Sequence, residues 1–80
     1  MPQKIKQDLP IGANIRKYRL AMNLTQGQLA AYMQLRGCDI GRSTLSHIES
    51  GDYNIKLSYI VTICEILEID FNTLFSNLDK

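Results

Sequence analysis

The sequence predicts an all-α protein, a compact bundle of five short helices. Apolar residues recur at three- and four-residue intervals through most of the 80 residues, as in amphipathic helices. No stretch alternates with a period of two, so no strand is expected. No run approaches the roughly 18 apolar residues that would span a membrane.

The first predicted helix covers residues 11–22. Pro10 lies just before it, where the missing N–H of proline has no consequence, and Asn23 ends it. Asn14, Arg16 and Lys17 are assigned to its other faces. Its inward positions are expected to be Ile11, Ile15, Tyr18 and Met22.

The second predicted helix starts at a capping box, in which Thr25 and Gln28 each satisfy the other residue's backbone N–H. Gly37 is its natural stop, because glycine accepts the left-handed conformation that ends many helices. Gly27, in the first turn, is either neutral drift or a place where a phosphate approaches the helix start closely. The inward positions are Leu29, Ala30 and Met33, with Tyr32 less clearly so.

The third helix is predicted at about residues 42–50. We expect the second helix to extend to Arg36 and a short loop to follow, with Leu35 and Ile40 as apolar anchors. Leu45 and Ile48 are the inward positions of the third helix, and Gly51 ends it. Asp52, Tyr53 and Asn54 are expected to form a turn.

The fourth and fifth helices complete the bundle. Residues 57–68 are apolar almost all round, which predicts a helix in the middle of the bundle or at an interface, with Thr62, Glu65 and Glu68 as its polar stripe. Asp70 is expected to cap a short last helix. The apolar face of that helix consists of Phe71, Leu74, Phe75 and Leu78.

The charge distribution indicates the contact side. Residues 1–48 carry seven basic and two acidic side chains, net +5, whereas residues 49–80 carry a net −4, which leaves +1 overall. A polyanion responds to the local face, so the basic half is the predicted contact side. One domain is expected at residues 11–78, preceded by a flexible arm at 1–10. The N-terminus has no apolar stretch of signal-peptide length, so we expect a cytoplasmic protein.

The order of three motifs resembles a known family. IGANIRKYRLAMNLTQGQLA, then RSTLSHIESG, then a helix ending in DFNTLF, is similar to the phage-repressor/Cro (XRE-type) helix-turn-helix DNA-binding family over residues 11–75. The resemblance implies the phage-repressor fold, here with a lengthened turn between the second and third helices. A similar Leu-x-Gly-Cys-Asp-Ile stretch occurs in a subgroup of bacterial regulators of this family.

The resemblance also implies how individual residues are used. The helix that starts at Thr25 is expected to lie across the DNA backbone, and the helix that starts at Arg42 to enter the major groove. Arg42 is the strongest candidate, because a guanidinium can bond O6 and N7 of guanine together. The residues expected to face base edges are Arg42, Ser43, Ser46 and His47. Those expected to contact phosphates are Thr25, Gln26, Tyr53, Asn54 and Lys56.

In family members the positions of Arg19 and Glu49 form a partly buried ion pair, and we expect the same pair here. Each residue assigned to DNA contact also has a purely structural or surface interpretation. The hydroxyls of the third helix could simply cap its first turn, and Arg42 and His47 could be solvated surface groups. Cys38 is expected in the surface loop, where a redox role competes with an inert free thiol, and Cys64 in the core.

Two classes of function remain open. The first is a sequence-specific transcription regulator, of repressor type, that binds double-stranded DNA as a homodimer on a palindromic operator. The second is a protein-binding module, such as an antitoxin or anti-repressor. No metal site, cofactor or catalytic residue is expected, because a single histidine and no phosphate loop give nothing to perform chemistry. Dimer contacts are expected where apolar residues exceed the needs of the core: Tyr59, Ile66, Phe71, Phe75 and Leu78.

Overall fold

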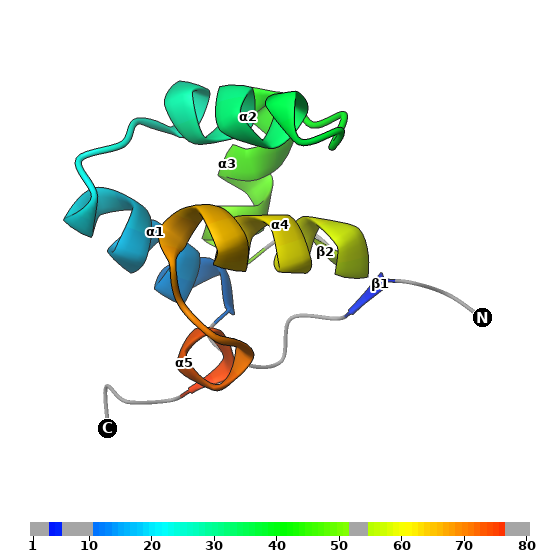
Figure 1. Ribbon diagram of the computed structural model, residues 1–80. Coiled ribbons are helices and arrows are strands. Elements are labelled where there is room, and N and C mark those ends of the chain that lie inside the picture. Colours follow the sequence, from blue (N-terminus) through cyan, green and yellow to red (C-terminus); the bar gives the residue numbers. More distant parts are fainter. Residues whose placement is uncertain (1–3, 6–10, 52–54, 77–80) are drawn as a thin grey trace.

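A computed structural model describes residues 4–5, 11–51 and 55–76, and the predicted five-helix architecture is confirmed in it (Figure 1). None of the described helices is both long and apolar enough to cross a membrane. The helices are α1 (Ile11–Ala21), α2 (Gln26–Leu35), α3 (Arg42–Ser50), α4 (Leu57–Leu67) and α5 (Phe71–Phe75).

The expectation of no strands was wrong in one detail. Two short strands, β1 (Lys4–Ile5) and β2 (Ile55–Lys56), pair antiparallel, with Ile5 opposite Ile55. Two residues are too few to show a period of two, so the sequence pattern carried no signal for them. The rest of the predicted arm at 1–10 lies outside the described residues, as does the turn predicted at 52–54.

The helix ends follow the predicted chemistry. Thr25 Oγ1 accepts the N–H of Gln28 at 3.0 Å, and Gln28 Oε1 accepts the N–H of Thr25 at 2.8 Å, which completes the capping box of α2. Asp70 Oδ1 caps α5 by accepting the N–H of Thr73 at 2.7 Å. At the end of α3, Gly51 has a φ of 86°, a left-handed conformation that glycine adopts without steric conflict.

The core lies where α1, α2, α3 and α4 meet. Helix α1 packs on α3, α4 and α5, and α2 packs on both α3 and α4. Seven of the eleven residues of α4 are buried, as its apolar composition predicted. Fully burying one such aliphatic side chain contributes about 1.5–3 kcal/mol. The largest fully buried side chains are Ile11, Ile15, Leu29, Met33, Ile40, Leu45, Ile48, Ile55, Ile60, Ile63 and Leu74.

Several inward or outward assignments were wrong, and three of them concern helix ends and the loop before α3. Met22, expected in the core, is 42% exposed because α1 ends at Ala21 and the chain turns there. Leu35, expected as an anchor of the following loop, is 82% exposed, whereas Ile40 is buried as expected. Thr62, assigned to the polar stripe of α4, is buried because the loop before α3 covers it.

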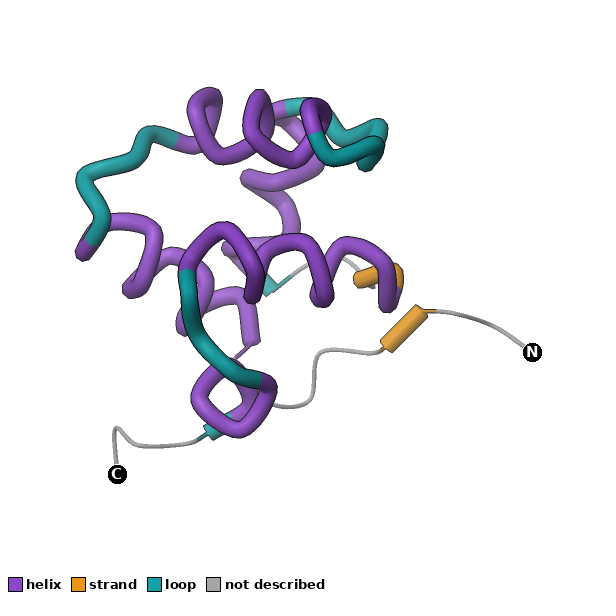
Figure 2. Tube along the Cα trace, in the orientation of Figure 1, coloured by secondary structure: helices purple, strands orange, loops and turns teal. Residues whose placement is uncertain are grey.

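The loop between α2 and α3, residues 36–41, is fastened to α4 (Figure 2, the teal segment beside the end of α2). Cys38 Sγ lies 3.0 Å from Thr62 Oγ1, and the hydroxyl of Tyr59 donates to the carbonyl of Asp39 at 3.3 Å. Gln34 Nε2 donates to the carbonyl of Ile40 at 2.7 Å. Cys38 is therefore buried, and the expectation of a surface thiol was wrong. The predicted extension of α2 followed by a short loop is confirmed, with Arg36 at the helix end.

One polar contact in the core was not predicted. Asn14, assigned to an outer face of α1, is 6% exposed. Its Nδ2 donates to the carbonyl of Leu74 at 2.7 Å and to that of Ser76 at 2.9 Å. These bonds join α5 to α1 and satisfy carbonyls at the end of the short helix.

Candidate nucleic-acid interface

Helix α3 has one buried edge and one solvent edge. Leu45 and Ile48 are fully buried, and Glu49 beside them is 7% exposed. The opposite edge is polar, and its members are the four side chains predicted to face base edges. All four are exposed: Arg42, Ser43, Ser46 and His47.

The start of α2 lies beside the start of α3. A β-carbon built on Gly27 would lie 3.8 Å from Arg42 Cδ, which is ordinary van der Waals contact. Sterics inside the protein therefore do not require glycine at this position. Thr25 is exposed at the start of α2, next to the N–H groups of the first turn that no helical carbonyl can accept. Both helix starts thus open onto the same side of the molecule.

A buried ion pair fixes α3 to α1, as the resemblance implied. Arg19 Nε donates to Glu49 Oε2 at 2.7 Å, and Arg19 Nη2 to Glu49 Oε1 at 2.9 Å, so the contact is bidentate. The side chains are 7% and 2% exposed, and Arg19 Nη1 also donates to the carbonyl of Leu24 at 2.7 Å. The hydrogen bond with Glu49 raises the pKa of Arg19 above its ordinary value, in opposition to desolvation.

Gln26 extends this network to α2. Its Nε2 donates to Glu49 Oε1 at 3.1 Å, and the side chain is half-buried. A side-chain amide has two N–H donors and a carbonyl, so this bond orients the group and, within the described residues, leaves its second N–H available. Glu49 consequently holds the first turn of α2 and the arginine of α1 in fixed positions relative to α3.

Arg16 belongs to this surface, although the sequence analysis did not assign it. A notch of about 190 Å³ forms where α1, α2 and α3 meet. Arg16 is exposed and, within the described residues, forms no ion pair. The sequence signal for this position was its spacing: residues three apart are neighbours on a helix, so Arg16 lies next to Arg19, which bonds α3. The residues that line the notch are Arg16, Gln26, Ser46, Glu49 and Ser50.

The other predicted phosphate contacts are less clearly placed. Lys56 is exposed at the N-cap of α4, and its Nζ lies 5.4 Å from the centroid of the Tyr59 ring. Tyr53 and Asn54 lie outside the described residues.

The expected surplus of apolar side chains at the C-terminal half is smaller than predicted. Tyr59 and Ile66 are 7% and 8% exposed, because both pack into the core of the single chain. Phe71 is 46% exposed and its ring stacks on that of the half-buried Phe75, with centroids 6.3 Å apart. Leu78 lies outside the described residues.

The cysteines and acidic groups of the described residues are not arranged as a metal site. Within residues 4–5, 11–51 and 55–76, no cluster of three His, Cys, Asp or Glu side chains is placed to hold a metal ion. Cys38 and Cys64 are both buried free thiols. Burial, with a smaller contribution from the charge of Asp70, raises the pKa of Cys64 above its ordinary value.

Comparison with known proteins identifies the family. A family model described as helix-turn-helix matches residues 15–74, which include the ion pair and both helices of the candidate interface. The chain belongs to the XRE-type helix-turn-helix family. The assignment places it among the DNA-binding regulators of transcription.

Solved structures agree with this assignment. The restriction-modification controller protein C.AhdI from Aeromonas hydrophila has a TM-score of 0.72 and 28% identity, covering 84% of this chain and 94% of that one. A hypothetical transcription factor, NHTF, from Neisseria has a TM-score of 0.69 and 27% identity, covering 95% of this chain and 84% of that one. A comparison with curated proteins gives no significant match.

Proposed function

We propose that the protein is a sequence-specific transcriptional repressor that reads a palindromic operator as a homodimer, with α3 in the major groove. One observation carries the proposal. The solvent edge of α3 presents an arginine, two serines and a histidine, while its other edge is buried and fixed by the Arg19–Glu49 pair. These side-chain types are the donors and acceptors that distinguish base edges.

The docking contacts follow from the neighbouring helix start. The first turn of α2 directs N–H groups and the positive end of its dipole toward solvent beside α3, which favours a phosphate. Gln26 offers its second amide N–H there, and Arg16 supplies a cation at the rim of the notch. The carboxylate of Glu49 does not oppose a phosphate strongly, because Arg19 neutralises it through two hydrogen bonds.

A second subunit supplies the specificity that one recognition helix lacks. One such helix contacts only a few base pairs, and two related half-sites about 10 base pairs apart double the contacts. A dimer that covers promoter DNA excludes other proteins from it, which is sufficient for repression. The comparison with a controller protein supports a regulatory role of this kind.

The outer face of α4 and α5 is the proposed dimer surface. Leu57, Val61 and Phe71 are 46%, 38% and 46% exposed, and the first two line a shallow groove of about 450 Å³ with Glu65. Leu57, Val61 and Glu65 follow each other at four-residue spacing on α4, so they form one stripe. Phe75 extends this surface through its stacked contact with Phe71.

Footprinting tests the whole proposal. Hydroxyl-radical cleavage of the DNA upstream of the protein's own gene should show two protected half-sites about 10 base pairs apart.

Fluorescence anisotropy with that DNA should then give about 5- to 150-fold weaker binding for Arg42→Ala, the range expected for one arginine–guanine contact. Lys17→Ala is the matched control, because it removes an exposed cation of α1 that does not line the notch between α1, α2 and α3. Equal affinities for these two variants would contradict the assignment of Arg42.

Two further variants test docking and dimerisation separately. Arg16→Ala should weaken binding to all sequences alike and reduce the salt slope by about one unit. Val61→Glu should convert the dimer to a monomer in sedimentation equilibrium, while Leu20→Glu, at an apolar position on α1 that is 48% exposed, should not. A Val61→Glu protein that remains dimeric would place the dimer surface elsewhere.

A further inference from the structure

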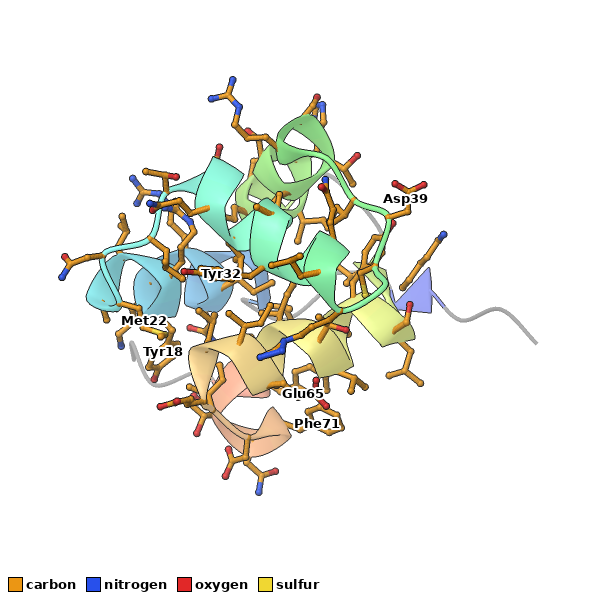
Figure 3. All side chains as sticks on the ribbon, turned by 45° about the horizontal axis from the view of Figure 1, so that its top comes forward. Tyr18, Met22, Tyr32, Asp39, Glu65 and Phe71 are labelled. Carbon is orange, nitrogen blue, oxygen red and sulfur yellow. The ribbon has the colours of Figure 1, made fainter. Side chains whose placement is uncertain are left out.

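A second apolar groove lies away from the surfaces described above. It occupies about 210 Å³ where the end of α1, the second half of α2 and the last turn of α4 meet. Figure 3 shows Met22, in the turn just after α1, and Tyr32 of α2 on this face, with Tyr18 beside them. The lining residues are Met22, Leu24, Tyr32, Arg36 and Ile66.

This groove is on the edge of α2 that faces away from α3. Gly27 approaches Arg42, and Gln34 bonds the carbonyl just before α3, so these two residues mark the α3 side of the helix. Tyr32 and Arg36, one turn apart, lie on the other side. The groove shares no lining residue with the stripe of Leu57, Val61 and Glu65. The groove is therefore distinct from α3 and from the stripe proposed as the dimer surface.

The residue types are those of protein interfaces. Met22 is 42% exposed and Tyr32 is 48% exposed, while Leu24 and Ile66 belong to the core or pack against it and form the floor. Leu35 is 82% exposed and lies about one helical turn after Tyr32, so it extends the apolar surface along α2. Methionine, tyrosine and arginine are enriched where proteins bind one another, because they combine apolar area with adaptable or polar ends.

The size of the groove favours a peptide segment over a small molecule. Sites for small ligands and cofactors enclose about 300–1,000 Å³, and this groove is smaller and open along one side. A volume of this kind accepts one or two apolar side chains of a helix laid across it.

The charge of the groove selects among such segments. Arg36 is exposed at its rim and, within the described residues, forms no ion pair. Among the described residues no carboxylate lines this groove, and Glu65 lines the other groove instead. We propose that this groove is a docking site for an amphipathic helix of another protein, which inserts bulky apolar side chains between Met22 and Tyr32 and pairs an aspartate or glutamate with Arg36.

Synthetic peptides test this proposal with the full chain. The probe is a fluorescein-labelled helical peptide of about 16 residues with leucine at positions i, i+3, i+4 and i+7 and glutamate on the flanks. A second peptide replaces glutamate by lysine, and a third replaces leucine by alanine. In anisotropy titrations the acidic leucine peptide should bind at least about tenfold more tightly than either of the others. Amide NMR shifts should change at Met22, Tyr32, Arg36 and Ile66.

Charge reversal supplies the decisive control. Arg36→Glu should reverse the preference, so that the lysine peptide binds better, whereas Lys17→Glu, an exposed charge outside the groove, should leave the acidic peptide preferred. Tyr32→Ala should weaken binding about tenfold or more, since it removes the aromatic side chain that lines the groove from α2.

Three results would overturn the proposal. The first is equal binding of the acidic and basic peptides, and the second is equal effects of Arg36→Glu and Lys17→Glu. The third is self-association of the free protein that Tyr32→Ala abolishes, which would make a second copy of this chain the occupant.

Discussion

Removing the carboxylate charge of Glu49 is the most informative single change to the fold. Glu49→Gln keeps the shape of the side chain and one carbonyl acceptor, but it leaves the guanidinium of Arg19 buried without a counter-charge. The pair is 7% and 2% exposed and bidentate, so solvent cannot take over the lost contact. The substitution also alters the acceptor that Gln26 uses, and thereby the link to α2.

The expected loss of stability is large relative to the total free energy of unfolding. Leaving one charge of a buried pair without its partner lowers the free energy of unfolding by about 3–5 kcal/mol. A domain of this size has a total stability of about 4–12 kcal/mol. At about 4–8 °C per kcal/mol, even 3 kcal/mol lowers the Tm by about 12–24 °C. The same change should weaken DNA binding, because it loosens the fixed orientation of α3.

A double-mutant cycle separates the pair from the charges themselves. Urea unfolding followed by circular dichroism should show Arg19→Met and Glu49→Leu each strongly destabilised, and the double variant less destabilised than the sum of the two. The reason is that an apolar pair leaves no unpaired charge in the core. Arg42→Ala serves as the control for loss of an exposed cation and should change stability by less than about 0.5 kcal/mol.

The reasoning would be refuted by additive single effects, which would show that Arg19 and Glu49 do not stabilise one another. It would also be refuted if Glu49→Gln left both the Tm and the DNA affinity unchanged.

Three further predictions concern other contacts. Asn14→Ala should lower the free energy of unfolding by about 1–3 kcal/mol, because two carbonyls lose their donor, and amide exchange in α5 should accelerate first. Backbone hydrogen bonds lower the pKa of Asp70, so its stabilising effect is complete above the unfolded value of about 3.9 and is lost as the pH falls through the folded pKa. Asp70→Asn should flatten that acid limb in pH-dependent unfolding, and an unchanged limb would contradict the cap. Burial raises the pKa of Cys64, so stability should decline as the pH rises above about 8.5 toward the folded pKa, and Cys64→Ala should remove that decline.

The sequence predicted what depends on local chemistry. The capping box of Thr25 and Gln28, the Asp70 cap and the glycine stop at Gly51 involve residues within a few positions of one another, and all are present. Helix periods likewise identified Leu45 and Ile48 as the buried edge of α3. The Arg19–Glu49 pair spans 30 residues and came from the family resemblance, not from spacing.

Apart from the end of α1 at Ala21, most of the errors concern contacts between distant segments. Asn14 is polar and has no local partner, so nothing near it in sequence indicates that it reaches α5, 60 residues away. Thr62 and Cys38 are buried only because the long loop folds back on α4. Tyr59 and Ile66 were predicted as surplus apolar surface, but both are buried because the core of so small a bundle takes in most of α4.

The residues of α3 that stabilise the fold and the residues that are exposed for DNA contact lie on different edges of the helix. The buried edge and its ion pair involve Leu45, Ile48 and Glu49, whereas Ser43 and His47 project to solvent on the other edge. Substitutions on the solvent edge should therefore alter which DNA is bound while folding stays nearly constant. A library that varies this edge would sample many operators on one unchanged scaffold, and new specificities could evolve without passing through unfolded intermediates.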